Sequence, residues 1–536
     1  MVDDSIVKAS STMALGTIFS RITGLVRNLM LASVLGTALL GDTYNVGNTM
    51  PNILYNILIG GALTAVFVPQ IVRSLRDSDG GEGFISKLYS SVVTVLFILT
   101  LIGVLAAPLL VNIYAPEFNG RPEFNLTVAF MRYCLPQIFF LGVFMLLGQI
   151  ANAKNKFGPM MWAPVLNNLI VIALLTWFLL NRRDISVGNI SDAEVAWLGL
   201  GTTFGYLAQA AILLPVIRRT GIKLKFRFDW RNSGLGKSVK LAGWSFIYAA
   251  ISQLSYLVTV NLATSAGVKA AESGISTGVG FTPYQNAYLI MILPHSVITV
   301  SLITALLPRL SNHVIDNQLS ELKESLTSAL KTVAVFTVPA ALVFLTFGPL
   351  IAKNLYFDLP ANDANYLGLV LSGLSLGLIP LSINLIIMRG LNAFENVKAQ
   401  AQINLIINIV AILLSVAGVM VFAPEWVTVW LGVTFPIHYL LGTFLSFRFL
   451  ARHGLRIRLR PILYFYTKLM LVTGIGLLPL WLLRNQIPGG NFLQLILVLV
   501  ATSLIYILTS RLLKIDEVSD AVKLLLRSTE IGRAHV

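Results

Sequence analysis

Two arginines lie inside the first long apolar stretch of the chain, residues 11–35. Arg21 stands at its middle and Arg27 follows about two helical turns later. The stretch is long enough to cross a bilayer, which takes about 20 residues. A central arginine costs about 2.5–3.5 kcal/mol on insertion scales, so two arginines facing lipid would be poorly tolerated. We therefore predict that both face a water-filled cavity or an anion. The alternative is that Arg27 reaches the interface and Arg21 bonds to a carbonyl.

Small residues share this predicted helix. Gly16, Ser20 and Gly24 recur at every fourth position, and Gly24 stands between Arg21 and Arg27, which are about 120° apart around the axis. Small residues allow close helix contacts in membranes. We predict that this broad face lines the cavity, with Ser20 beside the arginines.

Two further polar side chains could do chemistry near the membrane. Asp42 opens the predicted helix 43–74, where it could pair with an arginine of the first helix, bind a proton or cation, or act as a helix N-cap. His295 follows Pro294 and could face the cavity, although a packed or interfacial histidine remains equally open.

The composition predicts an all-α polytopic membrane protein. Of 536 residues, 56% are hydrophobic and 12% are charged. The single cysteine, Cys134, excludes an internal disulfide or a cysteine metal cluster. We find no Walker loop, no HExxH and no His/Cys cluster. These features indicate a transporter without its own ATPase, with no metal site and no cofactor, rather than an enzyme.

Apolar stretches predict about fourteen transmembrane helices. They lie near 10–36, 43–74, 86–114, 124–152, 159–180, 194–218, 237–265, 283–310, 327–356, 364–391, 397–422, 426–451, 462–484 and 491–513. With both termini in the cytoplasm, most of the 39 Lys and Arg residues fall on the inner side, as the positive-inside rule requires. The net charge of +15 therefore reflects topology and anionic-lipid contact, not nucleic acid.

An internal repeat divides the chain. Asn152-Ala153 recurs as Asn392-Ala393, and Asn168 recurs as Asn408 at the same offset, as do Thr64-Ala65 and Thr304-Ala305. Six helices separate the copies, which predicts two parallel six-helix lobes around a central cavity. We predict an N-terminal lobe over 1–235, a C-terminal lobe over 236–456, helices 13 and 14 over 457–515, and a cytoplasmic tail over 516–536. The last seven residues are expected to be artefactual, because their reverse translation permits a common sequencing-adapter sequence.

Positive charge within an otherwise apolar protein favours transport of an anionic amphiphile, because one arginine can donate two parallel hydrogen bonds to phosphate oxygens. A series of short motifs in the first 69 residues is similar to a known family: Phe19-Ser20-Arg21, Gly24, Arg27, Gly41-Asp42, Pro51-Asn52, Gly60-Gly61-Ala62 and Phe67-Val68-Pro69. The chain resembles the bacterial lipid II flippase family, MurJ or MviN, of the multidrug/oligosaccharidyl-lipid/polysaccharide exporter superfamily. The resemblance implies inner-to-outer-leaflet transfer of the undecaprenyl-diphosphate-linked peptidoglycan precursor, in the bacterial cytoplasmic membrane. It also implies that Arg21 and Arg27 bind the diphosphate and that Asp42 is a cavity residue.

Departures from the better-known members define further positions. Tyr55 replaces an arginine of the second helix, and Tyr288 stands where the eighth helix has a charged cluster, so both are cavity candidates. Asn404 and Asn408 hold the helix-11 positions of a sodium site without a carboxylate, which leaves sodium or the membrane potential as the driving force. Either could instead make a polar contact between helices, and we predict that Asn168 and Asn408 lie at equivalent depths in the two lobes and support interhelical hydrogen bonds. The pattern is more similar to the actinobacterial branch, in which a pseudokinase-like extension can follow helix 14.

Two other functions fit the same residues. One is a flippase for a different polyprenyl-diphosphate-linked glycan. The other is a scaffold that recruits cell-wall synthesis or division proteins through its basic loops and moves no lipid.

Overall fold

The structure is a computed structural model that describes residues 4–58, 68–154, 156–182, 184–229, 243–275, 277–484 and 490–520. These ranges contain helices and loops but no strand, and eleven of the helices are long and apolar enough to cross a membrane. The number is twelve if the bent pair α16 (Ala361–Ser375) and α17 (Leu378–Ala393) is one span. The all-α polytopic fold is confirmed. The predicted count of fourteen is not: α2 (Leu39–Leu58), for example, carries Asp42 and several asparagines that lower its hydropathy.

Contacts divide the chain into two compact units, residues 1–282 and 283–536. The first contains α1 (Asp4–Leu35), α2, α3 (Val68–Ser74), α4 (Glu82–Leu105), α5 (Ala107–Tyr114), the short helix η2 (Pro116–Phe118), α6 (Pro122–Cys134), α7 (Gln137–Ala153), α8 (Gly158–Asn181), α9 (Asp192–Ala211), α10 (Leu213–Arg219) and α12 (Gly243–Glu272). α13 (Phe281–Pro294) begins at the end of this unit. The second contains most of α13, the π-helical turn η3 (His295–Thr299), α14 (Val300–Ile315), α15 (Leu319–Leu355), α16, α17, α18 (Val397–Val421), α19 (Pro424–Ala451), α20 (Leu459–Leu482) and α21 (Asn491–Leu512).

One group of three helices recurs in both units. α6, α7 and α8 have 13, 17 and 24 residues, and α16, α17 and α18 have 15, 16 and 25. Asn168 lies in α8 and Asn408 in α18, which agrees with the repeat in the sequence. The predicted lobe boundary at residue 235 stays a prediction: by contacts, α12 belongs to the first unit, where it packs on α2, α5 and η2. Thr64-Ala65 and the last seven residues lie outside the described residues.

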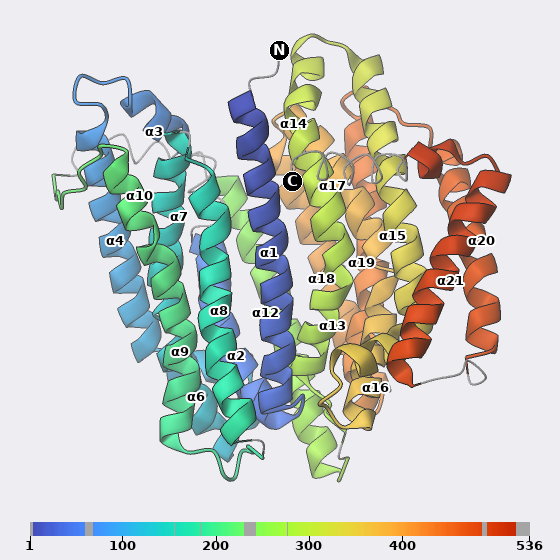
Figure 1. The fold of residues 1–536 in the computed structure, drawn as a ribbon, viewed down its shortest axis with the longest axis horizontal. Helices are drawn as coiled ribbons and strands as arrows, with labels where there is room; N and C mark the ends of the chain where they lie inside the picture. Colours follow the sequence, from blue (N-terminus) through green and yellow to red (C-terminus); the bar gives the residue numbers. More distant parts are fainter. Residues whose placement is uncertain are drawn as a thin grey trace. The chain divides into compact units, whose positions relative to one another are not determined.

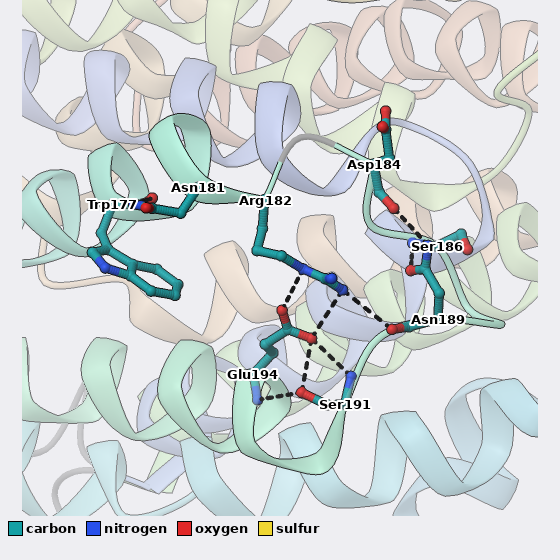
Figure 2. A network of polar contacts seen from close by, with 8 residues as sticks. All are labelled: Trp177, Asn181, Arg182, Asp184, Ser186, Asn189, Ser191 and Glu194. Atoms are coloured by element: carbon teal, nitrogen blue, oxygen red, sulfur yellow. Dashed lines mark hydrogen bonds and ion pairs between the residues drawn. The ribbon is translucent and has the colours of Figure 1, made fainter.

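The connection between α8 and α9 is closed by a polar network (Figure 2). Arg182 Nε lies 2.7 Å from Glu194 Oε1. Ser191 caps α9, because its hydroxyl accepts from the Glu194 backbone N–H at 3.3 Å while its own N–H donates to the Glu194 carboxylate at 2.8 Å. The Asn189 amide donates to the Asp184 carbonyl at 2.6 Å. The network fixes the end of α8, the helix along which α1 lies (Figure 1).

Candidate functional site

The two arginines of α1 are half-buried within a candidate membrane span, Leu15–Leu35. Neither guanidinium makes a hydrogen bond or an ion pair with another described residue. Arg27 has an electrostatic interaction with the Tyr44 side chain of α2. A cation in a membrane is costly unless it meets an anion or water. The pair is therefore suited to hold an anionic ligand.

α8 fixes the position of α1 on both sides of Arg21. The Asn168 amide donates to the Ser20 carbonyl at 3.0 Å and to the Thr23 hydroxyl at 3.0 Å. One residue before Ser20, the Phe19 ring stacks on Trp162 with ring centroids 5.5 Å apart. These bonds hold the backbone that carries both guanidinium groups.

Gly16 and Gly24 of α1 face α8, which corrects our prediction that these glycines line the cavity. The Ser20 side chain as a cavity residue stays a prediction. A Cβ on Gly16 would lie 2.9 Å from the Trp162 ring, and one on Gly24 would lie 3.5 Å from the Asn168 amide. The Ser20 carbonyl bonds to Asn168 on the same side. Small residues let the two helices approach closely, so this face is a packing surface.

Asp42 is fully buried and binds the start of α13. Its Oδ2 accepts from the Phe281 backbone N–H at 2.9 Å, and its Oδ1 accepts from the Thr282 N–H at 2.7 Å. The first N–H groups of a helix have no partner within the helix, and a carboxylate there also meets the positive end of the helix dipole. Asp42 thus caps α13. It does not pair with Arg21 or Arg27, and it lies inside α2, so it is not the cap of its own helix.

The absence of a side chain at Gly280 leaves room for the Asp42 carboxylate at the start of α13. A Cβ there would lie 2.1 Å from Asp42 Oδ2, and the φ of +149° is one that residues with a side chain rarely adopt. Any side chain at this position would displace the carboxylate from α13.

Further polar residues follow Asp42 along α2, and their contacts were not predicted from the sequence. The Asn45 amide donates to the Thr282 hydroxyl at 2.9 Å, and the Gln137 amide of α7 donates to Asn48 Oδ1 at 3.1 Å. Asp42, Asn45 and Asn48 recur at every third residue, which places them near one face of a helix. This spacing is the sequence feature from which a polar face on the second helix could have been predicted. Tyr55 lies further along α2 and is half-buried.

The other predicted site residues lie in the second unit and do not form one cluster. The Tyr288 ring meets the Phe435 ring edge-on at 5.8 Å. His295 is buried, and its Nδ1 lies 2.8 Å from the Ser382 hydroxyl, at the start of the π-helical turn. Asn408 donates to Asn404 on its own helix at 3.0 Å. Among the described residues, Asn408 therefore makes no interhelical bond like that of its repeat equivalent Asn168, contrary to our prediction for this pair.

Comparison with known protein families matches residues 31–501 to the family described as lipid II flippase MurJ. The chain belongs to this family. It is accordingly a multi-span lipid II flippase of the peptidoglycan pathway and a transporter rather than a catalytic enzyme.

Individual relatives agree with this family. A probable lipid II flippase MurJ of Buchnera aphidicola subsp. Baizongia pistaciae is 24% identical over 492 residues, which cover 91% of each chain. One from Rhizobium meliloti is 27% identical over 357 residues, covering 66% of this chain and 63% of the relative. The chain thus spans somewhat under two thirds of the Rhizobium protein.

Solved structures show the same fold. A lipid II flippase MurJ in an inward closed conformation superimposes with a TM-score of 0.74 at 21% identity, covering 94% of this chain and 99% of that one. An inward-facing multidrug resistance MATE transporter of the MOP superfamily gives a TM-score of 0.65 at 14% identity, covering 81% and 95%.

Proposed function

We propose that this flippase carries lipid II from the inner to the outer leaflet of the cytoplasmic membrane by alternating access. Arg21 and Arg27 hold the diphosphate of the substrate while the first unit faces the cytoplasm. The observation that carries the proposal is the pair of half-buried guanidinium groups without a hydrogen-bonding or ion-pair partner among the described residues.

No described carboxylate of the first unit pairs with either arginine. The Asp42 carboxylate is engaged by the start of α13, so it leaves the arginines positive. A guanidinium stays charged at any physiological pH and donates two parallel hydrogen bonds to phosphate oxygens. A diphosphate offers oxygens to both groups, and Asn168 bonds to Thr23, which lies between the two arginines on α1.

We propose no bound cofactor and no ATPase for the transport step, with both termini in the cytoplasm. The driving force is a sodium gradient or the membrane potential, and transport in vesicles that carry only one of the two distinguishes them. Cell-wall synthesis or division proteins are proposed as further partners, through the basic loops.

The test is depletion of the native flippase followed by leaflet-specific labelling of lipid II. Cells expressing Arg21→Ala or Arg27→Ala should expose about tenfold to a hundredfold less lipid II at the outer leaflet, the effect of losing a hydrogen-bonded charge worth about 1.5–3 kcal/mol. Because alanine relieves the cost of inserting arginine, both variants should reach the membrane at normal abundance. Arg132→Ala is the matched control, since Arg132 is exposed on α6.

Normal lipid II exposure in both alanine variants would remove the proposal. Rescue of growth by these variants, together with failure of a variant that lacks the charges of the basic loops, would indicate the scaffold instead. Export of a different polyprenyl-linked glycan with no change in lipid II would indicate the alternative flippase.

A further inference from the structure

An extended segment, residues 222–229, runs alongside the first turns of α4 after α10 ends (Figure 1). We call this segment the strap. Two serines one turn apart on α4 hold its backbone. The Ser86 hydroxyl donates to the Lys223 carbonyl at 3.4 Å and accepts from the Lys225 N–H at 3.3 Å. The Ser90 hydroxyl accepts from the Arg227 N–H at 2.7 Å.

The serine contacts are buried, so the path of the strap is determined by α4. Ser86 is 2% exposed and Ser90 is fully buried. A salt bridge closes the end of the strap, with Lys87 Nζ 2.8 Å from Asp229 Oδ2. The strap is thus fixed by hydrogen bonds along its length and by an ion pair at its end, even though it belongs to no helix.

Side chains of the strap alternate in character. Successive residues of an extended chain point to opposite sides, so the cationic Lys223, Lys225 and Arg227 share one side and the apolar residues between them share the other. Phe226 is 61% exposed and Phe228 is 66% exposed. Their rings lie 6.5 Å apart, and the Phe226 ring lies 5.5 Å from the Tyr89 ring of α4.

The surface of α4 continues this apolar side. Phe97 and Leu101 lie seven and eleven residues after Ser90, near the same face of the helix. They are 61% and 51% exposed within a candidate membrane span. In a membrane this face would meet lipid tails, and the strap runs along the first turns of α4 at the end of the span.

We propose that the strap is an interfacial anchor that binds anionic phospholipid headgroups. Lys223 and Lys225 meet the headgroup phosphates, and Phe226 and Phe228 enter the boundary between headgroups and acyl chains. Arg227 pairs with Asp229 at 2.9 Å, whereas Lys223 and Lys225 form no salt bridge with another described residue and so supply the charge complementarity. Each basic residue near an anionic surface raises binding by about fivefold. Exposed apolar rings beside basic residues are typical of segments that lie in this boundary. The anchor holds neither Arg21 nor Arg27, so it stands independently of the proposed transport site.

The test uses the full chain in nanodiscs and a Phe228→Trp substitution as a reporter. The signal of the eight native tryptophans is subtracted with the parent protein. Brominated phosphatidylglycerol and brominated phosphatidylcholine are titrated separately as contact quenchers. We expect the added tryptophan to be quenched at a lower mole fraction of the anionic lipid. Lys225→Gln should raise the half-quenching mole fraction of that lipid about fivefold.

Two further variants make the result specific. Lys269→Gln is the matched control, because it removes a half-exposed lysine at the end of α12 and should change nothing. Ser90→Ala keeps every charge but removes the bond to Arg227, so it should also weaken quenching. Equal quenching by both lipids, or the same value in Lys225→Gln as in the parent, would overturn the proposal. Quenching by neither lipid would likewise overturn it and would favour a protein partner.

Discussion

Asp42 and Phe281 are 239 residues apart in the chain, and the carboxylate of the first accepts a 2.9 Å hydrogen bond from the backbone N–H of the second. This bond and its neighbour to Thr282 join α2 to the start of α13. Asp42, which the sequence offered as a counter-ion for an arginine, thus serves as a helix cap.

Asp42→Asn should weaken this cap. The amide keeps one acceptor oxygen for two backbone donors, and it carries no charge to meet the helix dipole. We expect a loss of about 1.5–3 kcal/mol in stability, the range for hydrogen bonds to charged groups, measured by unfolding in detergent with increasing denaturant. A variant of full stability that has lost transport would instead indicate a proton- or cation-binding role for Asp42.

Gly280→Ala should destabilise the same contact from the other side. The added methyl group would overlap the Asp42 carboxylate. The backbone of residue 280 has a φ that is unfavourable for alanine. The expected cost is about 1–3 kcal/mol in the same unfolding measurement. Gly474→Ala in α20 is the control, because nothing lies within 4 Å of its Cβ position. Equal stabilities for the two variants would contradict the assigned role of Gly280.

Asn168→Ala should have a mild effect on stability but a larger one than Asn408→Ala. Interhelical polar contacts in membranes are worth about 0.6 kcal/mol on average. Asn168 makes such contacts with Ser20 and Thr23, whereas Asn408 bonds within its own helix. Unfolding of both variants in detergent measures the difference. Loss of transport in a normally folded Asn408→Ala would point to an ion or substrate role.

Arg21→Lys separates charge from geometry. Lysine keeps the positive charge but cannot donate two parallel hydrogen bonds to phosphate oxygens. We expect normal membrane abundance and a clear fall in lipid II exposure at the outer leaflet, short of the loss in Arg21→Ala. Transport equal to that of the unmodified protein would show that charge alone suffices at this position.

The end of the strap should depend on pH. Lys87 and Arg227 lower the pKa of Asp229 from 3.8 to about 2. A lowered carboxyl pKa stabilises the docked strap at pH values above about 4, and that contribution is lost as the pH falls from about 4 to about 2. Hydrogen exchange of the Arg227 N–H, corrected for its intrinsic pH dependence, should accelerate as the pH falls across this range.

The same ion pair can be removed at neutral pH. Asp229→Asn should speed tryptic cleavage after Lys225, because the end of the strap loses its bond to Lys87. The control Asp192→Asn should leave the rate of this cleavage unchanged.

The class of this protein could be predicted from its sequence because the deciding properties are local. Long apolar stretches require helices in a bilayer, whatever their neighbours are. An arginine within such a stretch is costly enough to indicate a function before any contact is known, and Arg21 and Arg27 do lie half-buried without an ion-pair partner among the described residues. The repeat of α6–α8 in α16–α18 also follows from residue spacing alone.

Tertiary structure decided which groups meet. A capping bond between Asp42 and Phe281 depends on the path of the chain between them, which no local pattern contains. Asn168 and Asn408 hold equivalent places in the repeat, yet Asn168 bonds to the Ser20 carbonyl of α1, which packs on α8, and Asn408 bonds to Asn404 on its own helix. Likewise, the basic segment after α10 was recognisable as a charged loop. Its attachment to Ser86 and Ser90 arises only when α4 is folded beside it, since a buried hydroxyl must find its partner among whatever groups the fold brings near.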